Sequence, residues 1–260
     1  MSKLLEQITE SLPSNWSEIS LSQYLELQEC EADPDLEGTE LLIEQLSILL
    51  DTDNTDPLWD ELSIEEFFAL TAQVSWLSRP PRAVLEREYN GYTLKPFNSL
   101  LLGEFIDIEH FISQGYTASS TIAAILYKQT RTNDWGHRVW EPYTYDLETR
   151  AQRFEGLSVS AIWAMFEEYR FWKEDFMEKY DPLFADTSEE PEGYVAEALS
   201  ALERAEAQKK AAREEAQRQW SWESILWTLS GGDVSRFEDL FNSNVILIFN
   251  VLAMKKVLEV

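Results

Sequence analysis

The sequence predicts a mainly α-helical protein with one small β-hairpin. Apolar residues recur at three- and four-residue spacing along most of the chain, capping signals precede several of these runs, and an Asn-Gly dipeptide stands between two short apolar segments. With 260 residues, of which 44% are hydrophobic and 13% aromatic, the chain can bury a sizeable core. We therefore expect a multi-helix globular body with a hairpin at about residues 83–96, a long charged helix and a C-terminal helical block.

Charge is spread unevenly along the chain. The 48 acidic and 21 basic residues leave a formal net charge of −27, which disfavours direct binding to nucleic acid or to an anionic membrane surface. Residues 1–66 alone hold eighteen carboxylates and one lysine, Lys3. We interpret these carboxylates as the solvated faces of amphipathic helices, with a surface that mimics DNA as the alternative.

Capping and turn signals place the first elements. Ser63 and Glu66 have capping-box spacing before an apolar run, which predicts a helix from this point to about Trp76, stopped by the Pro-Pro pair within residues 79–82. Asn90-Gly91 favours the two positive φ values of a type I′ turn, so residues 83–96 are expected to form the hairpin. Its apolar face should pack on neighbouring helices or pair with another chain.

The middle of the chain returns to a helical period. Residues 99–115, 117–130 and 158–179 each carry apolar side chains at helical spacing and predict three helices. Residues 131–145 are polar and rich in aromatic side chains, and we expect a loop there. Its aromatic residues are expected to pin the loop onto its own domain, with a binding surface as the alternative.

The composition changes sharply after residue 185. We expect a main domain over residues 1–185, an acidic linker at residues 186–193 and a charged spacer helix at residues 194–219, whose apolar positions are mostly alanine. Residues 220–260 predict three short helices, which are too few to bury their aromatic faces alone. This block is therefore expected to dock on the main body or on a partner.

No pattern in the sequence predicts a catalytic, cofactor or metal site. Cys30 is the only cysteine and the chain has two histidines, too few for a Cys/His zinc site, and the glycine-rich, nucleophile-elbow and metalloprotease motifs are absent. Asp107, Glu109 and His110 share one predicted helix, but we expect a solvated structural role for them. The Asp51, Asp53 and Asp56 string lacks the central glycine of a calcium loop and favours a turn that ends a helix.

Landmarks along most of the chain resemble a family of tailed-bacteriophage proteins. They are NWSEISLSQY at residues 15–24, LWDELS at 58–63, the hairpin around Asn90-Gly91, LGEFID at 102–107, IAAILY at 122–127, Trp135-Gly136, EPYTYD at 141–146, WSWESIL at 220–226 and residues 233–240. These are packing and turn motifs without catalytic content. The acidic first quarter departs from the family pattern. The resemblance is to tail assembly chaperones and other virion assembly proteins, and it implies function through protein contacts.

From this resemblance we expect a non-enzymatic tail assembly chaperone that binds the tape-measure and tail-tube proteins. A structural protein retained in the virion and an acidic DNA-mimic inhibitor of a host DNA-binding protein are the alternatives. The chain has no signal-peptide core at its start and no run of eighteen apolar residues, which favours the host cytoplasm, or the virion, over a membrane. The expected partner anchors are aromatic: Trp220, Trp222, Trp227 and Phe237.

Overall fold

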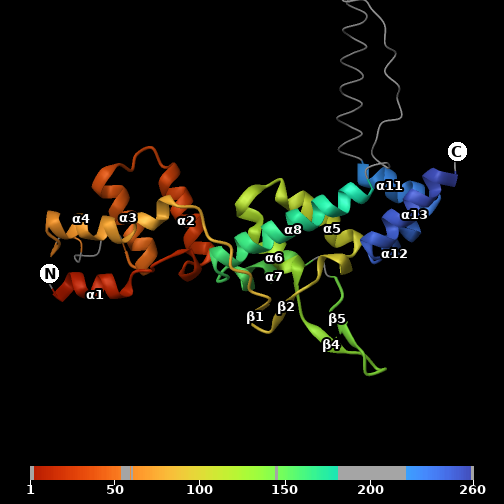
Figure 1. The fold of residues 1–260 in the computed structure, drawn as a ribbon, viewed down its shortest axis with the longest axis horizontal. Helices are drawn as coiled ribbons and strands as arrows, with labels where there is room; N and C mark the ends of the chain where they lie inside the picture. The colour runs from red at the N-terminus through yellow and green to blue at the C-terminus, as the bar shows by residue number, and fades with distance from the viewer. Residues whose placement is uncertain (1–2, 54–58, 60, 144–145, 181–220, 259–260) are drawn as a thin grey trace, which may run out of the picture. The chain divides into compact units, whose positions relative to one another are not determined.

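The computed structural model describes residues 3–53, 59, 61–143, 146–180 and 221–258. Over these residues the chain is mainly helical with two small antiparallel sheets, which confirms the predicted fold class (Figure 1). The chain divides into two compact units, Met1–Lys95 with Ile108–Lys173, and Pro96–Asp107 with Glu174–Val260. We call them unit 1 and unit 2. The expected linker at 186–193 and spacer helix at 194–219 lie outside the described residues.

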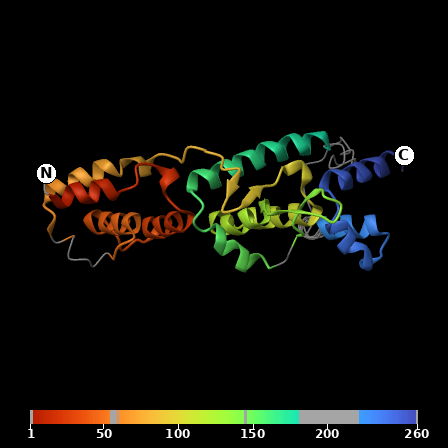
Figure 2. The same cartoon turned by 90° about the horizontal axis from the view of Figure 1, so that it is seen from below.

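Unit 1 begins with a group of helices. They are α1 (Lys3–Ser11), η1 (Trp16–Glu18), α2 (Leu21–Ala32), α3 (Gly38–Leu50), α4 (Ile64–Gln73) and η3 (Ser75–Ser78). In Figure 2, α2 lies beside α3 and α1 beside α4. Ser63 and Glu66 form the predicted capping box at the start of α4. Asp51 ends α3 in a left-handed conformation (φ 53°), so the prediction of a helix-terminating turn is confirmed there.

The predicted hairpin forms part of a three-stranded sheet. Strands β1 (Glu88–Tyr89) and β2 (Tyr92–Leu94) flank Asn90 and Gly91, whose φ values of 48° and 81° fit a type I′ turn. Strand β3 (Tyr127–Lys128) adds to β2, with Leu94 opposite Tyr127. One tyrosine from each strand then packs on the buried ring of Phe154, with centroid separations of 5.9, 5.2 and 5.6 Å. The hairpin is thus covered within the chain.

The middle region contains the three predicted helices, with shifted ends, and two short helical segments, α7 (Leu147–Ala151) and η6 (Gln152–Phe154), that the sequence did not predict. The other elements are α5 (Leu102–Ile112), η5 (Gly115–Ala118), α6 (Ser119–Leu126) and α8 (Val159–Lys179). The expected helix over residues 117–130 ends at Leu126, because Tyr127 and Lys128 pair with β2 instead. Long-range strand pairing therefore overrides local helical periodicity here.

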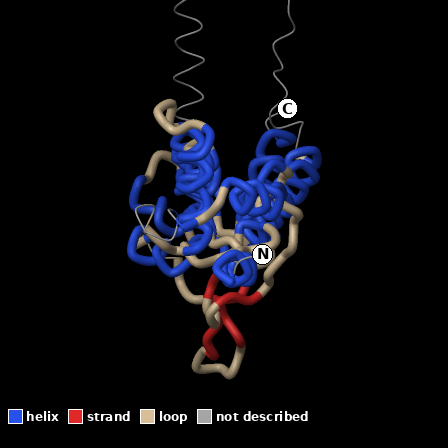
Figure 3. The backbone as a smooth tube through the Cα atoms, turned by 90° about the vertical axis from the view of Figure 1, so that its left-hand side faces the viewer, coloured by secondary structure: helices blue, strands red, loops and turns tan. Residues whose placement is uncertain are grey.

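Residues 131–145 are not the predicted loop. Strands β4 (Thr130–Thr132) and β5 (Arg138–Trp140) form a second antiparallel hairpin, which extends away from the helices of unit 1 (Figure 3). The Asn133 side chain accepts hydrogen bonds from the backbone N–H groups of Trp135 (3.1 Å) and His137 (2.8 Å), and Gly136 takes a positive φ of 79°. This turn chemistry brings the strands together although the segment is polar.

Unit 2 contains the C-terminal helices and a segment from the middle of the chain. Its elements include η4 (Phe97–Ser99), α11 (Ser221–Ser230), η7 (Val234–Arg236), α12 (Phe237–Phe241) and α13 (Val245–Leu258). The three predicted short helices are thus confirmed. The Leu102 N–H donates to the Ser243 carbonyl (2.8 Å) and the Val245 N–H to the Leu100 carbonyl (2.9 Å). These bonds join residues 96–107 to the C-terminal block, whereas sequence placed that segment in a 1–185 domain.

Two buried tyrosines of unit 1 predict a loss of stability at alkaline pH. The Tyr169 hydroxyl donates to Glu109 Oε1 (2.9 Å) and the Tyr127 hydroxyl to the Glu86 carbonyl (2.5 Å), and burial raises the pKa of both phenols. The folded state therefore holds these protons more tightly than the unfolded state. The resulting stabilisation is complete below the unfolded tyrosine pKa of about 10 and is lost as pH rises above it.

We expect a titration followed by tyrosinate absorbance to show a group of tyrosines that ionise only as the circular dichroism of the helices disappears. Simultaneous ionisation of all ten tyrosines near pH 10, with the helical signal intact, would contradict this account.

Candidate protein-interaction site

A continuous chain of aromatic rings crosses unit 1. The ring centroids of Trp76 and Trp16 are 5.1 Å apart, those of Trp16 and Tyr24 5.7 Å, those of Tyr24 and Tyr116 5.6 Å, and those of Tyr116 and Trp163 5.9 Å. The first three contacts are edge-on, and Tyr116 stacks on Trp163 with 15° between planes. Such pairs stabilise by about 0.5–1.5 kcal/mol beyond area burial. They fix the orientation of the rings at the surface end.

The row of aromatic rings reaches the surface at Tyr116 and Trp163, where an apolar groove lies. We call it the aromatic groove; it has a volume of about 430 Å³ and is lined by Ile112, Gly115, Tyr116, Trp163, Phe166, Glu167 and Arg170. Ile112 is 38% and Tyr116 41% exposed. Gly115 has a φ of 77°, a conformation that lets the chain turn from α5 into η5 and presents Tyr116 to the groove. One wall is therefore the turn after α5, and the other is α8.

Two charged residues are among those that line the aromatic groove. Glu167 and Arg170 belong to α8, and the Arg170 guanidinium lies 4.5 Å from the ring centre of the neighbouring Phe171, which is 59% exposed. Burial raises the pKa of the Tyr116 phenol, so this wall is uncharged at neutral pH. A mainly apolar lining with one carboxylate and one guanidinium suits aliphatic or aromatic side chains of a protein segment.

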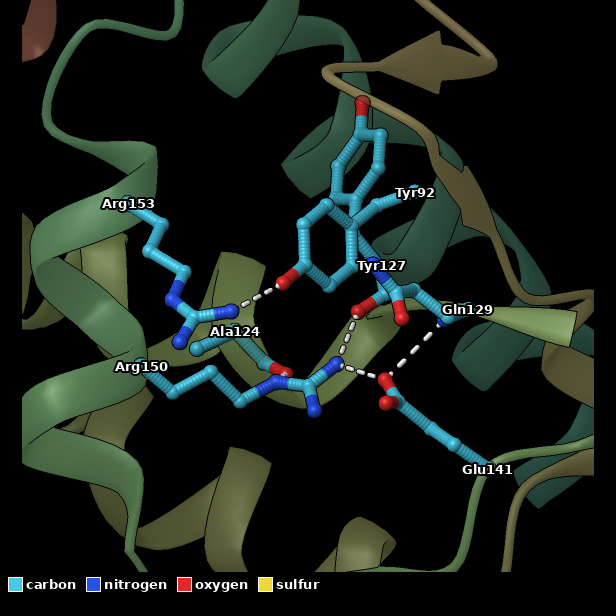
Figure 4. A network of polar contacts seen from close by, with 7 residues as sticks. All are labelled: Tyr92, Ala124, Tyr127, Gln129, Glu141, Arg150 and Arg153. Atoms are coloured by element: carbon cyan, nitrogen blue, oxygen red, sulfur yellow. Dashed lines mark hydrogen bonds and ion pairs between the residues drawn. The ribbon is translucent and has the colours of Figure 1, made fainter.

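The β4–β5 hairpin is fixed to unit 1 by a buried polar network at its base (Figure 4). The Arg150 guanidinium donates to the carbonyls of Ala124 (2.7 Å) and Tyr127 (2.6 Å) and pairs with Glu141, which follows β5. Glu141 also accepts the Gln129 N–H at 3.0 Å. Burial opposes ionisation of Glu141, but the hydrogen bonds from Arg150 and Gln129 hold its pKa below the usual value. The base of the hairpin is thus held by a part-buried ion pair, in which the Arg150 side chain is 10% and the Glu141 side chain 23% exposed.

Two of the described aromatic residues between 131 and 143 differ in their surroundings. Tyr143 lies against its own domain, with the Lys128 ammonium 4.8 Å from its ring centre, as the prediction of a pinned segment requires. Trp135 at the tip of the hairpin is 83% exposed, so the prediction is wrong for this side chain. The reason is geometric: Trp135 lies in the turn beyond the last strand pair, Thr132 with Arg138, and no described part of the domain covers it.

The predicted aromatic anchors occupy different environments. Trp222 is half-buried against Phe105 and Phe249 of unit 2, at ring separations of 5.5 and 6.3 Å, and belongs to the packing of that unit. Trp227 is 56% exposed and Phe237 half-buried. Trp220 lies outside the described residues. Of the three anchors that are described, Trp227 alone presents most of its ring to solvent.

The residues of the aromatic groove escaped sequence reasoning because they come from separate segments. In the sequence, Trp163 is one of several aromatic residues on the helix predicted over residues 158–179, and Tyr116 follows the end of the helix predicted over residues 99–115. One sequence pattern could have indicated the groove. It is the apolar residue Ile112 at the end of an amphipathic run, followed by Gly115 and an aromatic residue.

The candidate metal ligands have other partners. Glu109 accepts a hydrogen bond from Tyr169 and pairs with Lys173, and the His110 ring lies 3.0 Å from the Gln114 amide nitrogen. Among the described residues no group of three histidine, cysteine or carboxylate side chains is placed to hold a metal ion. Glu109 instead joins α5 to α8 within unit 1.

No protein-family model matches this chain, and neither the curated proteins nor the solved structures include a match to it. Within the described ranges, none of the helices has the length and apolar character needed to span a membrane.

Proposed function

We propose that this protein is a non-enzymatic assembly factor of tailed bacteriophages, a tail assembly chaperone that binds the tape-measure and tail-tube proteins in the host cytoplasm. The observation that carries a protein-binding role is the aromatic groove, which offers an apolar floor and pre-oriented rings at the surface of unit 1. The phage context comes from the resemblance of the sequence landmarks.

The groove suits transient shielding of an apolar segment. Interface energy concentrates in a few buried aromatic and aliphatic contacts, and rings already held by their neighbours lose little conformational entropy when a partner binds. In this proposal a helical segment of the tape-measure protein inserts an apolar side chain between Tyr116 and Ile112 on one wall and α8 on the other. The high negative charge of the chain keeps the loaded complex soluble while the tail tube polymerises.

The decisive experiment is capture of the tagged full-length chain from cells that produce the whole set of phage proteins. Mass spectrometry would be run on the captured proteins and on purified particles side by side. Tape-measure or tail-tube protein in the eluate, with this chain missing from particles, is the expected result. A fixed copy number in particles would replace the chaperone proposal with a virion component, and capture of a host DNA-binding protein would favour the DNA mimic.

Substitution in the groove gives a sharper test. Ile112→Lys places a charge on the groove wall, and we expect recovery of the captured phage partner to fall at least about tenfold, because desolvating an unpaired ammonium opposes binding. The matched control is Val84→Lys, at an apolar residue of unit 1 that is 47% exposed and does not line this groove. Equal recovery with both variants would show that the groove is not the binding surface.

A further inference from the structure

A second apolar groove lies between the start of α3 and α4 in unit 1. We call it the α3–α4 groove; its volume is about 440 Å³ and it is lined by Gly38, Thr39, Leu42, Leu62, Ile64, Phe67, Phe68 and Thr71. None of these residues lines the aromatic groove. Ile64 and Phe68 are each 72% exposed, which is unusual for large apolar side chains one helical turn apart.

Helix α4 carries two apolar faces. Leu70 is fully buried and the C-cap residue Val74 is 5% exposed, so these residues define the face that packs on the neighbouring helices. Ile64, Phe67, Phe68 and Thr71 follow the i, i+3, i+4, i+7 spacing of a second stripe, which lines the groove. Ile64 and Phe68 of the second face remain 72% exposed within the described residues. The second face is therefore available for a partner.

The surroundings of the α3–α4 groove are strongly acidic. Glu37 and Glu40 adjoin Gly38 and Thr39 in the sequence, Glu61 and Glu65 adjoin Leu62 and Ile64, and all four glutamate side chains are exposed. No lysine, arginine or histidine occurs between residues 4 and 78. An apolar groove inside a region of one charge sign selects a partner that combines apolar side chains with the opposite charge.

We propose that the α3–α4 groove binds a basic amphipathic helix. Two apolar side chains of that helix, three or four residues apart, would enter between Leu42 and Phe68, and its lysine or arginine residues would face the surrounding carboxylates. A second copy of this chain is disfavoured, because its own acidic helices would be repelled. The inference concerns a surface separate from the aromatic groove and holds whether or not the chaperone proposal is right.

The test uses the full-length chain and a fluorescein-labelled synthetic peptide of about 18 residues, the length of five helical turns. Leucine and lysine are arranged in the peptide so that leucines form one face of a helix. One control peptide has the same composition in scrambled order, and another carries glutamate in place of lysine. Fluorescence anisotropy then compares their dissociation constants. We expect the amphipathic basic peptide to bind at least about tenfold more tightly than either control peptide.

Variants assign the binding to the groove. The double substitution Ile64→Ser and Phe68→Ser removes the exposed apolar pair, and we expect it to weaken binding at least about tenfold. Its control is Val257→Ser with Leu258→Ser, at two apolar residues that are 74% exposed in α13. The double substitution Glu40→Lys and Glu65→Lys should weaken binding by a similar factor. Glu148→Lys with Glu155→Lys makes the same change in net charge at exposed positions elsewhere in unit 1.

Each result decides the question. Weakening by both groove variants and by neither control variant supports the proposal, as does a loss of affinity when salt rises from about 0.05 to about 0.5 M. Equal binding of the scrambled peptide would mean that charge alone attracts it and would overturn the proposal. Unchanged affinity in the Ile64→Ser, Phe68→Ser protein would overturn it as well. Should circular dichroism show that this variant is misfolded, the comparison of the two charge-reversed proteins decides.

Discussion

Replacement of Arg150 by methionine is expected to lower the free energy of unfolding by about 3–5 kcal/mol, because it removes a buried guanidinium from two carbonyls and from a part-buried carboxylate. The arginine side chain is 10% exposed, and its guanidinium satisfies the carbonyls of Ala124 and Tyr127 as well as Glu141. Methionine fills much of the same volume but donates no hydrogen bond. The two carbonyls then lose the guanidinium donor, and the Glu141 carboxylate loses its charged partner but keeps the Gln129 N–H. Urea unfolding of both proteins at neutral pH measures the difference.

The neighbouring Arg153 supplies the matched control. It is exposed and donates to the Tyr92 hydroxyl at 2.5 Å, so Arg153→Met should cost about 1 kcal/mol or less. The pH dependence separates the ion pair from the carbonyl bonds. Folding lowers the pKa of Glu141, so its contribution is present above the unfolded pKa of about 4.3 and is lost as pH falls through the lower folded value. The difference in the free energy of unfolding between the wild-type protein and Arg150→Met should therefore become smaller as pH falls over that range.

An equal loss of stability in the Arg150 and Arg153 variants would contradict this account, because it would mean that the buried bonds add nothing to a surface arginine. If the difference in the free energy of unfolding between wild type and Arg150→Met stayed constant at acidic pH, the loss of stability would come from the hydrogen bonds to the Ala124 and Tyr127 carbonyls alone.

Local signals in the sequence were enough to predict the elements whose boundaries depend on neighbouring residues. The Ser63–Glu66 capping box and the Asn90-Gly91 turn appear where expected, because each is closed by hydrogen bonds or backbone angles within four residues. The helix over residues 158–179 was predicted for a similar reason, since its periodicity extends over many turns. Local chemistry alone decides such features.

Features that depend on distant residues could not be predicted in this way. Tyr127 and Lys128 leave the helix to pair with β2, more than thirty residues earlier in the chain. The aromatic groove depends on the contact between Tyr116 and Trp163, and no local sequence pattern predicts a contact between such distant residues. Nothing in the sequence distinguishes Arg150 from the other arginines, because its role depends on bonds to three partners from three separate segments. The surfaces proposed here to bind partners are therefore products of tertiary packing.

Truncation of Phe249 to alanine is expected to destabilise unit 2 by about 3–5 kcal/mol, the range for removing a buried phenylalanine. The side chain is fully buried, and its ring lies 4.8 Å from Phe176, 5.3 Å from Tyr180 and 6.3 Å from both Phe105 and Trp222. These rings come from four segments of the chain. Alanine would therefore leave a cavity that no single segment can fill by a small movement, and thermal or urea unfolding measures the loss.

Phe249→Leu is the matched variant, because it keeps most of the apolar volume and should cost less than half as much as alanine. Exposed Leu247, two residues earlier on α13, gives the surface control: Leu247→Ala should change stability by about 0.5 kcal/mol or less. If Phe249→Ala and Leu247→Ala were equally mild, the cluster of rings could not be the core that holds the C-terminal helices to residues 96–107. If both were severe, the exposed face of α13 would have to be covered in solution, and the oligomeric state of the full chain would show by what.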